Sequence, residues 1–307
     1  MFKRLSPHAG AAAAALFVTF LWSTSWVLIK FGLRDAIPPL IFAGLRYGLA
    51  FACLAVWSLG QPSTWAALRG LGRQDWLLLV ALGLIFYAVT QGTQFLGLKY
   101  LPAVTLNLLM TFSAALVAGM SALALREPPT RAQWGGVGLY LVGALVFFYP
   151  AALPGDMLLG VGIGLVGVAA NAVSALMGRA INRCGHLPPL AVTVASMGIG
   201  AGVLLGAGLA VENFPPLSLS SILIIVWLAV VNTAFAFTLW NRSLRVLSAL
   251  ESSLINNLMM VFIPLLAWLF LGENIGAQQA AGLILAGAGI LIVQLRRVPA
   301  GLARKRR

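Results

Sequence analysis

Long apolar runs separated by short polar breaks dominate the chain. A helix of about 20 mostly apolar residues is long enough to cross the hydrocarbon core of a bilayer, and ten runs of roughly this length are present. They lie at residues 11–33, 38–59, 77–98, 102–125, 132–150, 157–180, 188–211, 219–241, 247–271 and 277–295. Several breaks carry prolines, which interrupt helices, as in Pro38-Pro39 and Pro188-Pro189. The pattern predicts an all-α polytopic membrane protein with ten transmembrane helices and no separate soluble domain.

One stretch of this pattern occurs twice. Residues 123–143 read LALREPPTRAQWGGVGLYLVG, and residues 269–289 read LFLGENIGAQQAAGLILAGAG. The identical pairs are Leu123/Leu269, Leu125/Leu271, Glu127/Glu273, Gln133/Gln279, Gly136/Gly282, Leu139/Leu285 and Gly143/Gly289. Self-similarity at a fixed offset marks a duplicated structural unit. We therefore expect a five-helix repeat over residues 1–150, a second over 151–296, and a basic tail over 297–307.

Composition and charge narrow the class of protein further. With 61% hydrophobic and 9% charged residues, the chain cannot cover a water-exposed surface, which takes about a quarter charged residues. The formal net charge of +13 comes from basic residues in the tail and beside the apolar runs. That placement favours membrane topology and anionic lipid headgroups over nucleic acid as the partner. The two cysteines and two histidines match no metal or redox spacing, so neither a metal site nor a cofactor is predicted.

Basic residues also predict the orientation of the helices. If the N-terminus is cytoplasmic, the inner flanks hold most of the Lys and Arg, while the outer flanks hold Lys30, Arg34 and Lys99. The excess of positive charge on the inside places both termini in the cytoplasm. Because each repeat has an odd number of helices, the second repeat must be inverted relative to the first. Inverted repeats are common in secondary transporters, which bind substrate near the midplane between the halves.

Two halves of five helices, each containing L-x-E-x5-Q-x2-G-x2-L-x3-G, resemble the EamA-type branch of the drug/metabolite transporter superfamily. Within that branch, the whole chain is most similar to the YddG-type exporters of aromatic amino acids. The first copy departs from the usual L-G-E turn, because Arg126 stands where the second copy has Gly272. The resemblance implies export across the bacterial inner membrane by alternating access, without an ATPase subunit. The chain has no GxxxxGK[ST] sequence for binding nucleotide phosphates.

Polar and aromatic side chains within the runs are the candidates for a substrate pocket, because polar groups at membrane depth tend to face a bundle interior or a wet cavity. Tyr87, Gln91 and Gln94 share one helical face. Their repeat counterparts are Thr233, Phe237 and Trp240. The other candidates are Trp22, Ser23, Trp26, Arg46, Asn107, Thr111, Asn171 and Asn257. Amides and hydroxyls between aromatic walls suit an amphipathic solute with a flat apolar part, such as an aromatic amino acid.

Each of these residues also has a structural interpretation. Asn, Gln and Ser join membrane helices by hydrogen bonds. Arg46, the one charge well inside a predicted span, either binds a substrate carboxylate or extends toward the interface or a backbone carbonyl. Glu127 and Glu273 are interpreted as caps at the starts of the fifth and tenth helices. Close helix packing is expected on the GxxxGxxxG face of the seventh helix, which consists of Gly198, Gly202 and Gly206.

Three classes of function remain open at this point. The first is an exporter of amino acids, drugs or other small metabolites. The second is a membrane-embedded enzyme, which would need paired carboxylates, a His–Asp pair or a metal cluster at membrane depth. All acidic residues lie at predicted helix ends or loops, so no catalytic residues are predicted. The third is a channel or scaffold, although inverted repeats favour a two-state carrier.

Overall fold

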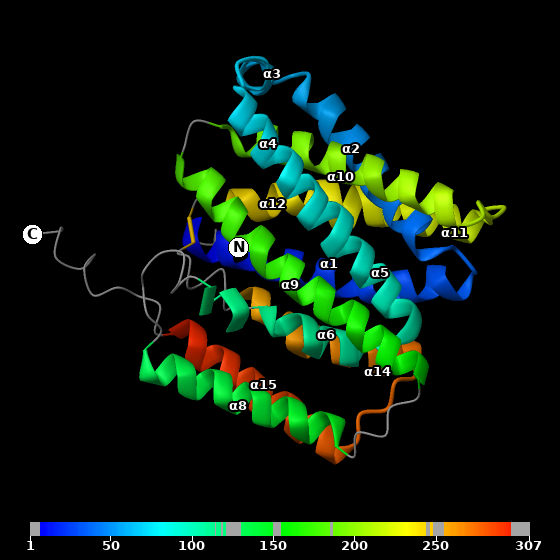
Figure 1. The fold of residues 1–307 in the computed structure, drawn as a ribbon, viewed down its shortest axis with the longest axis vertical. Coiled ribbons are helices and arrows are strands. Elements are labelled where there is room, and N and C mark those ends of the chain that lie inside the picture. Colours follow the sequence, from blue (N-terminus) through cyan, green and yellow to red (C-terminus); the bar gives the residue numbers. More distant parts are fainter. Residues whose placement is uncertain are drawn as a thin grey trace, which may run out of the picture.

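The computed structural model describes residues 7–113, 115–117, 119–120, 130–149, 155–184, 187–243, 246–247 and 255–295. Every regular element in these ranges is a helix (Figure 1). The first half contains α1 (Pro7–Arg34), α2 (Pro39–Ser58), α3 (Pro62–Arg69), α4 (Arg73–Leu82), η1 (Gly83–Thr90), α5 (Gln91–Tyr100), α6 (Ala103–Thr111) and α8 (Arg131–Phe148). The second half contains α9 (Gly155–Cys184), α10 (Pro189–Val211), α11 (Leu219–Ala229), η2 (Val230–Phe235), α12 (Ala236–Ser243), α14 (Met259–Leu271) and α15 (Ala277–Leu295).

Six of the described helices are long and apolar enough to cross a membrane. They cover Pro7–Arg34, Pro39–Ser58, Arg73–Tyr100, Gly155–Gly178, Pro189–Val211 and Leu219–Trp240. Shorter apolar helices cover Ala103–Val117, Ile255–Leu271 and Ala277–Ile292. Large apolar side chains remain on the outer surface, for example Leu145 and Ile284, which are each 71% exposed. Lipid tails, unlike water, can cover such a surface, and the protein is therefore an all-helical, multi-pass membrane protein.

Most helices begin and end near the predicted positions, and two regions differ. The sequence analysis did not predict α3, which begins at Pro62 because proline favours the first helical turn. The predicted span 247–271 is described as helix only from residue 255, with a turn at Leu258 and Pro264 inside α14. Part of the predicted span 102–125 lies outside the described residues.

The two helices that contain the repeated stretch, α8 and α15, lie side by side along one edge of the bundle (Figure 1). A methyl carbon at Gly289 would lie 2.5 Å from the carbonyl oxygen of Gly136, and one at Gly282 would lie 2.7 Å from that of Gly143. Gly136 and Gly282 are equivalent in the two repeats, as are Gly143 and Gly289. The contact between Gly289 and Gly136 and the contact between Gly282 and Gly143 are therefore the same contact with the two repeats exchanged. This is the pattern of a two-fold symmetric interface. Residue numbers rise along α8 where they fall along α15, so these equivalent helices are antiparallel.

A second pair of equivalent helices, α2 and α10, is also antiparallel. A methyl carbon at Gly208 would lie 2.8 Å from the amide nitrogen of Ile41, whereas one at Gly198 would lie 2.7 Å from the ring of Phe51. Of the predicted glycine face, Gly198 alone makes a close contact, because nothing lies within 4 Å of the Cβ positions of Gly202 and Gly206. The other close approaches of α10 come from a different face, at Gly200 against Gly83 and at Gly208. The spacing of the glycines did not reveal which face meets a neighbour.

A π-helical segment interrupts the same position in both repeats. η1 continues α4 into α5, and η2 continues α11 into α12. The hydroxyl of Thr90 donates to the carbonyl of Ile85 at 2.9 Å, and that of Thr233 donates to the carbonyl of Leu228 at 2.8 Å, each five residues back. Such segments are rare and occur frequently at functional sites. Tyr87 in η1 and Thr233 in η2 are the equivalent positions identified in the sequence.

The shared glutamine of the repeated stretch caps the helix that follows it. In α8, Gln133 Oε1 accepts from the Thr130 amide at 2.8 Å, and Thr130 Oγ1 accepts from the Gln133 amide at 3.3 Å. This reciprocal pair is a capping box. In α15, Gln279 Oε1 accepts from the amide of Gly276 at 3.0 Å. Since Gly276 has no side chain, the second copy keeps only half of the box.

The shared glutamate caps a different helix from the one predicted. The carboxylate of Glu273 accepts from the amides of Ala103 and Val104 at 2.7 and 3.1 Å, at the start of α6 rather than α15. A carboxylate is favoured there by the helix dipole and the unpaired amides. Glu212, after α10, makes a similar contact at 3.2 and 2.9 Å with the first amides of α2. Glu127 lies outside the described residues.

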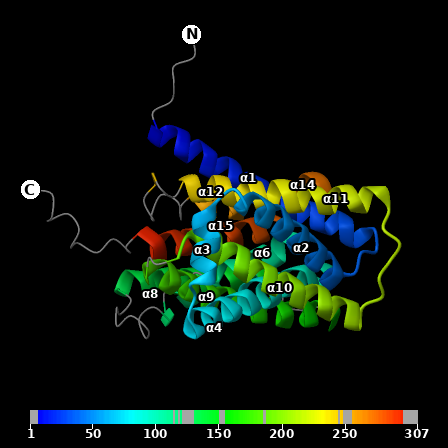
Figure 2. The ribbon, with the colours of Figure 1, turned by 90° about the horizontal axis from the view of Figure 1, so that it is seen from above.

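Two basic side chains at the end of α1 lie at the same end of the bundle as Glu273 and also bond to neighbouring helices. Lys30 Nζ donates to the carbonyl of Leu101 at 2.6 Å, and Arg34 Nη2 donates to the carbonyl of Leu271 at 3.2 Å. The acceptors are the carbonyls of the residue that follows α5 and of the last residue of α14, where the helix dipole favours a cation. The opposite end of the bundle holds the start of α1 and the end of α15 (Figure 2).

Candidate functional site

Arg46 of α2 is buried between the two halves of the protein, with 5% of its surface exposed. Its Nε donates to Thr233 Oγ1 of η2 at 3.1 Å, and its Nη2 lies 3.5 Å from Ser25 Oγ of α1. The guanidinium carbon lies 5.1 Å from the ring centre of Tyr47 and 6.0 Å from that of Phe95, within the range of cation–π attraction. Among the described residues, Arg46 thus bonds to neutral hydroxyls and aromatic faces and forms no salt bridge. It neither extends to the interface nor bonds to a described backbone carbonyl.

Asn232 of η2 connects this arginine to Trp22. Its Nδ2 donates to Ser25 Oγ at 2.9 Å, to Thr24 Oγ1 at 3.0 Å and to the carbonyl of Leu21. The backbone carbonyl of Asn232 accepts from the indole nitrogen of Trp22 at 3.1 Å. Because α1 belongs to the first half and η2 to the second, these bonds join the two halves.

The predicted face of the third span contacts the same arginine through Tyr47. The Tyr47 hydroxyl donates to Gln91 Oε1 at 2.7 Å. The rings of Tyr47 and Tyr87 meet edge to face, with centroids 5.7 Å apart. Gln91 and Tyr87 therefore belong to the surroundings of Arg46, as their shared helical face indicated.

An aromatic cluster adjoins this polar network. The ring of Trp22 lies 5.4 Å from that of Phe237 and 5.2 Å from that of Trp240, between centroids. All three side chains are half-buried. We call Arg46, Ser25, Asn232 and Thr233 the polar network, and Trp22, Phe237 and Trp240 the aromatic cluster.

The remaining candidates lie elsewhere or have local partners. Ser23 donates to the carbonyl of Thr19 within α1, and Trp26 is part of the buried core. On α6, Thr111 donates to the carbonyl of Asn107 at 2.7 Å. The Nδ2 of Asn107 is buried without a hydrogen-bond partner among the described residues.

Asn171 of α9 donates to Ser113 Oγ at 2.9 Å and so joins two helices. Gln94 of α5 is half-buried, as is Asn257, which precedes α14. None of these three residues bonds to the polar network in the described contacts. The predicted residues therefore form more than one group, and the substrate candidates with direct connections are those around Arg46 and Trp22.

Sequence reasoning missed two members of the polar network and one residue that contacts it. Ser25, Tyr47 and Asn232 were not selected as site residues, although each is buried. Asn232 had a usable signal, because an asparagine in the middle of the eighth span is costly unless it has partners. Ser25 and Tyr47 had none, since a serine three residues from Trp22 and a tyrosine beside Arg46 are both common in apolar helices.

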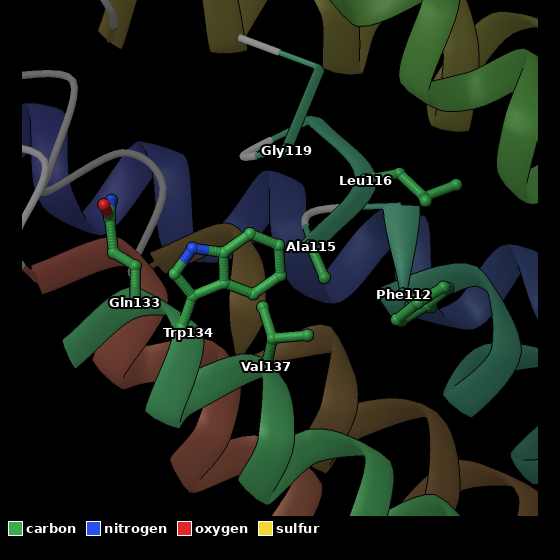
Figure 3. A pocket seen from close by; sticks show the side chains of 7 residues that line it. All are labelled: Phe112, Ala115, Leu116, Gly119, Gln133, Trp134 and Val137. Atoms are coloured by element: carbon green, nitrogen blue, oxygen red, sulfur yellow. The ribbon is translucent and has the colours of Figure 1, made fainter. Parts of the chain in front are cut away.

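Two cavities lie away from this network. One, with a volume of about 150 Å³, lies between α8 and the segment that follows α6, and Trp134 and Val137 point toward Ala115 there (Figure 3). The other, of about 130 Å³, lies beside Glu273 and Asn274. The first has an almost wholly apolar lining that includes Phe112, and neither is lined by the polar network or the aromatic cluster.

Chemically, the described arrangement offers binding rather than bond-breaking. The network contains one cation, neutral donors and acceptors, and aromatic rings, but no carboxylate or imidazole to act as a general acid or base. No group of His, Cys, Asp or Glu side chains within the described ranges could hold a metal ion. These groups suit the recognition of a small polar solute.

Comparison with known proteins places both halves in one family. Residues 9–149 and residues 158–295 each match the EamA-like transporter family. The chain is 26% identical over 291 residues to a Salmonella typhimurium protein described as a probable amino-acid metabolite efflux pump, covering 91% of this chain and 92% of the relative. It is 27% identical over 285 residues to an S-adenosylmethionine/S-adenosylhomocysteine transporter of Chlamydia trachomatis, covering 89% of this chain and 86% of the relative.

A solved crystal structure with 18% sequence identity has a TM-score of 0.67, covering 93% of this chain and 98% of the other, which shows a shared fold. The double family match also indicates a duplicated unit. Because the matched segments cover most of the sequence, the chain belongs to the EamA-like transporter family and is a transporter of small metabolites rather than an enzyme.

Proposed function

We propose that this protein exports amino acids, aromatic ones in particular, or related small metabolites across the bacterial inner membrane, in the manner of the YddG-type exporters. The observation that carries the proposal is the buried Arg46, held between the two halves and beside the aromatic cluster. A guanidinium suits a substrate carboxylate, and stacked rings suit a flat apolar side chain. The relative described as an amino-acid metabolite efflux pump supports the same substrate class.

The transport cycle is alternating access between two inverted halves of five membrane helices each. The antiparallel contacts of α8 with α15 and of α2 with α10 support the inversion, because a two-fold axis in the membrane plane relates helices in this way. Arg34 at the end of α1 contacts Leu271, just before α15, which places the start of α1 and the end of α15 at one end of the bundle. This supports two termini on one side of the membrane, and the distribution of basic residues makes that side the cytoplasm.

Flux measurements test the substrate class directly. Purified protein in vesicles should move labelled L-tryptophan, L-phenylalanine and L-tyrosine saturably, and aliphatic amino acids more slowly. If the protein moves S-adenosylmethionine and no amino acid, the proposed substrate is wrong, although the protein is still a transporter. No saturable flux of any amino acid or S-adenosylmethionine would refute the proposal.

Two substitutions test the location of the site. Trp22→Ala removes the centre of the aromatic cluster, and Gln91→Ala removes the acceptor of the Tyr47 hydroxyl. Both should lower transport at unchanged membrane abundance. Thr238→Val is the matched control, because among the described contacts the Thr238 hydroxyl bonds only to the carbonyl of Ala234, four residues earlier in the same span. Wild-type transport in both variants would contradict this placement of the site.

Cysteine labelling tests the topology. On a cysteine-free background, a cysteine at position 273 should react with an impermeant reagent from outside, and one at position 127 from the cytoplasm. The reverse pattern would overturn the orientation.

A further inference from the structure

The side-chain oxygen of Asn232 is a buried acceptor without a donor. Asn232 has no exposed surface. One of the three acceptors around its amide is the carbonyl of Leu21, which cannot donate, so the nitrogen must face Leu21 and the oxygen must face away. That oxygen has no hydrogen-bond partner among the described residues. An unpaired buried carbonyl is costly, so its presence in a folded protein calls for a functional or structural explanation.

Within the described part of the chain, Arg46 lacks a charged acceptor, whereas Asn232 lacks a donor. It is a buried cation whose described partners are two neutral hydroxyls, at 3.1 and 3.5 Å, and two aromatic rings. The longer contact, from Nη2 to Ser25 Oγ, is a weak hydrogen bond. A buried guanidinium is stabilised far better by a carboxylate, which accepts two parallel hydrogen bonds.

The two deficient groups are neighbours. Asn232 Nδ2 and Arg46 Nη2 both contact Ser25 Oγ, so the amide and the guanidinium are one side chain apart. Asn232 also accepts, at its backbone carbonyl, the hydrogen bond from Trp22, which belongs to the aromatic cluster. The guanidinium of Arg46, the amide of Asn232 and the aromatic cluster are therefore joined through Ser25 and Trp22.

We propose that Arg46 and Asn232 bind the two charged ends of a zwitterionic α-amino acid. The guanidinium of Arg46 donates to the ligand carboxylate, and the ligand ammonium donates to Asn232 Oδ1. The side chain of the ligand packs against the aromatic cluster. Binding replaces the long Arg46–Ser25 contact and supplies the missing donor to Asn232. This inference rests on the proposed function, since it assigns the head-group contacts of the same site.

Analogues that lack one charged end test the proposal on the wild-type protein. The probes are L-tryptophan, tryptamine, which lacks the carboxylate, and indole-3-propionate, which lacks the ammonium. We expect tryptamine and indole-3-propionate each to need at least about a 10-fold higher concentration than unlabelled L-tryptophan to inhibit labelled L-tryptophan flux by half, because a charge-assisted hydrogen bond is lost. Equal inhibition by all three compounds would overturn the proposal without any variant.

Substitutions at Arg46 and Asn232 then test which charged end of the ligand each residue binds. Arg46→Gln should weaken L-tryptophan and indole-3-propionate by about 10-fold or more and leave tryptamine unchanged, whereas Arg46→Lys should restore part of the loss. Asn232→Thr should weaken L-tryptophan and tryptamine and leave indole-3-propionate unchanged. Thr238→Val serves as the control, and thermal unfolding in detergent checks that each variant is folded.

The outcomes separate this proposal from the proposed function. If wild-type protein moves L-tryptophan but both variants weaken all three compounds equally, the network is structural, and only the head-group assignment fails. If the protein moves a non-aromatic amino acid with the same dependence on both charged ends, the aromatic preference fails and the head-group assignment stands. If no amino acid is bound or moved, both fail.

Discussion

Removing the carboxylate of Glu273 should destabilise the described conformation by an amount that follows from its contacts. The α6 helix begins after Pro102 and has no side-chain cap of its own, so its first amides depend on Glu273, at 2.7 and 3.1 Å. Ala103 and Val104 are 0% and 4% exposed, so water cannot replace the lost acceptor. Loss of a cap costs about 0.5–2 kcal/mol, and the charge on this acceptor and the burial of the amides place Glu273→Ala near the upper end, at about 2 kcal/mol.

Two further variants isolate the causes. Glu273→Gln keeps one acceptor oxygen but loses the charge that favours the helix N-terminus, so it should cost about 1 kcal/mol. Asn274→Ala removes an exposed side chain from the same loop and should change the unfolding free energy by less than about 0.5 kcal/mol. Reversible unfolding in mixed micelles measures all three. A Glu273→Ala value within about 0.5 kcal/mol of wild type would refute the capping role.

The same contact joins the second half to the first, so it must break if that end of the bundle opens. If the described conformation is destabilised by about 2 kcal/mol relative to one in which that end is open, the equilibrium between the two shifts toward the open conformation by about 30-fold. With Cys53 and Cys184 replaced by serine, a cysteine at Thr105, which lines the cavity beside Glu273, reports the opening. Its labelling by an impermeant thiol reagent should accelerate in Glu273→Ala and remain unchanged in Asn274→Ala. Unchanged labelling despite lost stability would show that the contact persists in both states.

Four substitutions test the glycine contacts and the capping box. Gly200→Ala should reduce the yield and the melting temperature of folded protein, because the added methyl group would overlap the carbonyl of Gly83. Gly202→Ala should be neutral or stabilising, because nothing lies within 4 Å of the added methyl group. Equal melting temperatures for the two variants would contradict the observed face of α10. Gln133→Ala should lower the unfolding free energy by about 1 kcal/mol, because the Thr130 amide loses its acceptor, Gln133 Oε1, while the bond from the backbone amide of residue 133 to Thr130 Oγ1 can remain. Restoration of stability by Gln133→Glu would identify the acceptor as the cause, and failure to restore it would point to the packing of the side chain instead.

The sequence by itself determined the class of protein and the duplication. Apolar runs of membrane-spanning length and few charges predict a multi-pass helical protein, which the long apolar helices and the double family match confirm. The repeated stretch contains the glutamines that cap α8 and α15 and the glycines at which these two helices meet, but both roles came from the structure. The apolar runs and the repeat are readable because they depend only on residue type and spacing along the chain.

Only the tertiary structure decided which helix each distant group serves. Glu273 lies just before α15 yet caps α6, and the closely packed face of α10 contains Gly200 and Gly208 rather than Gly202 and Gly206. The network around Arg46 likewise depends on Ser25, 21 positions before Arg46, and on Asn232, 207 positions after Ser25. Local periodicity states which side chains share a face of one helix. It does not state which neighbouring helix that face meets, and in a membrane bundle, where most surfaces are equally apolar, packing geometry and buried hydrogen bonds make that choice.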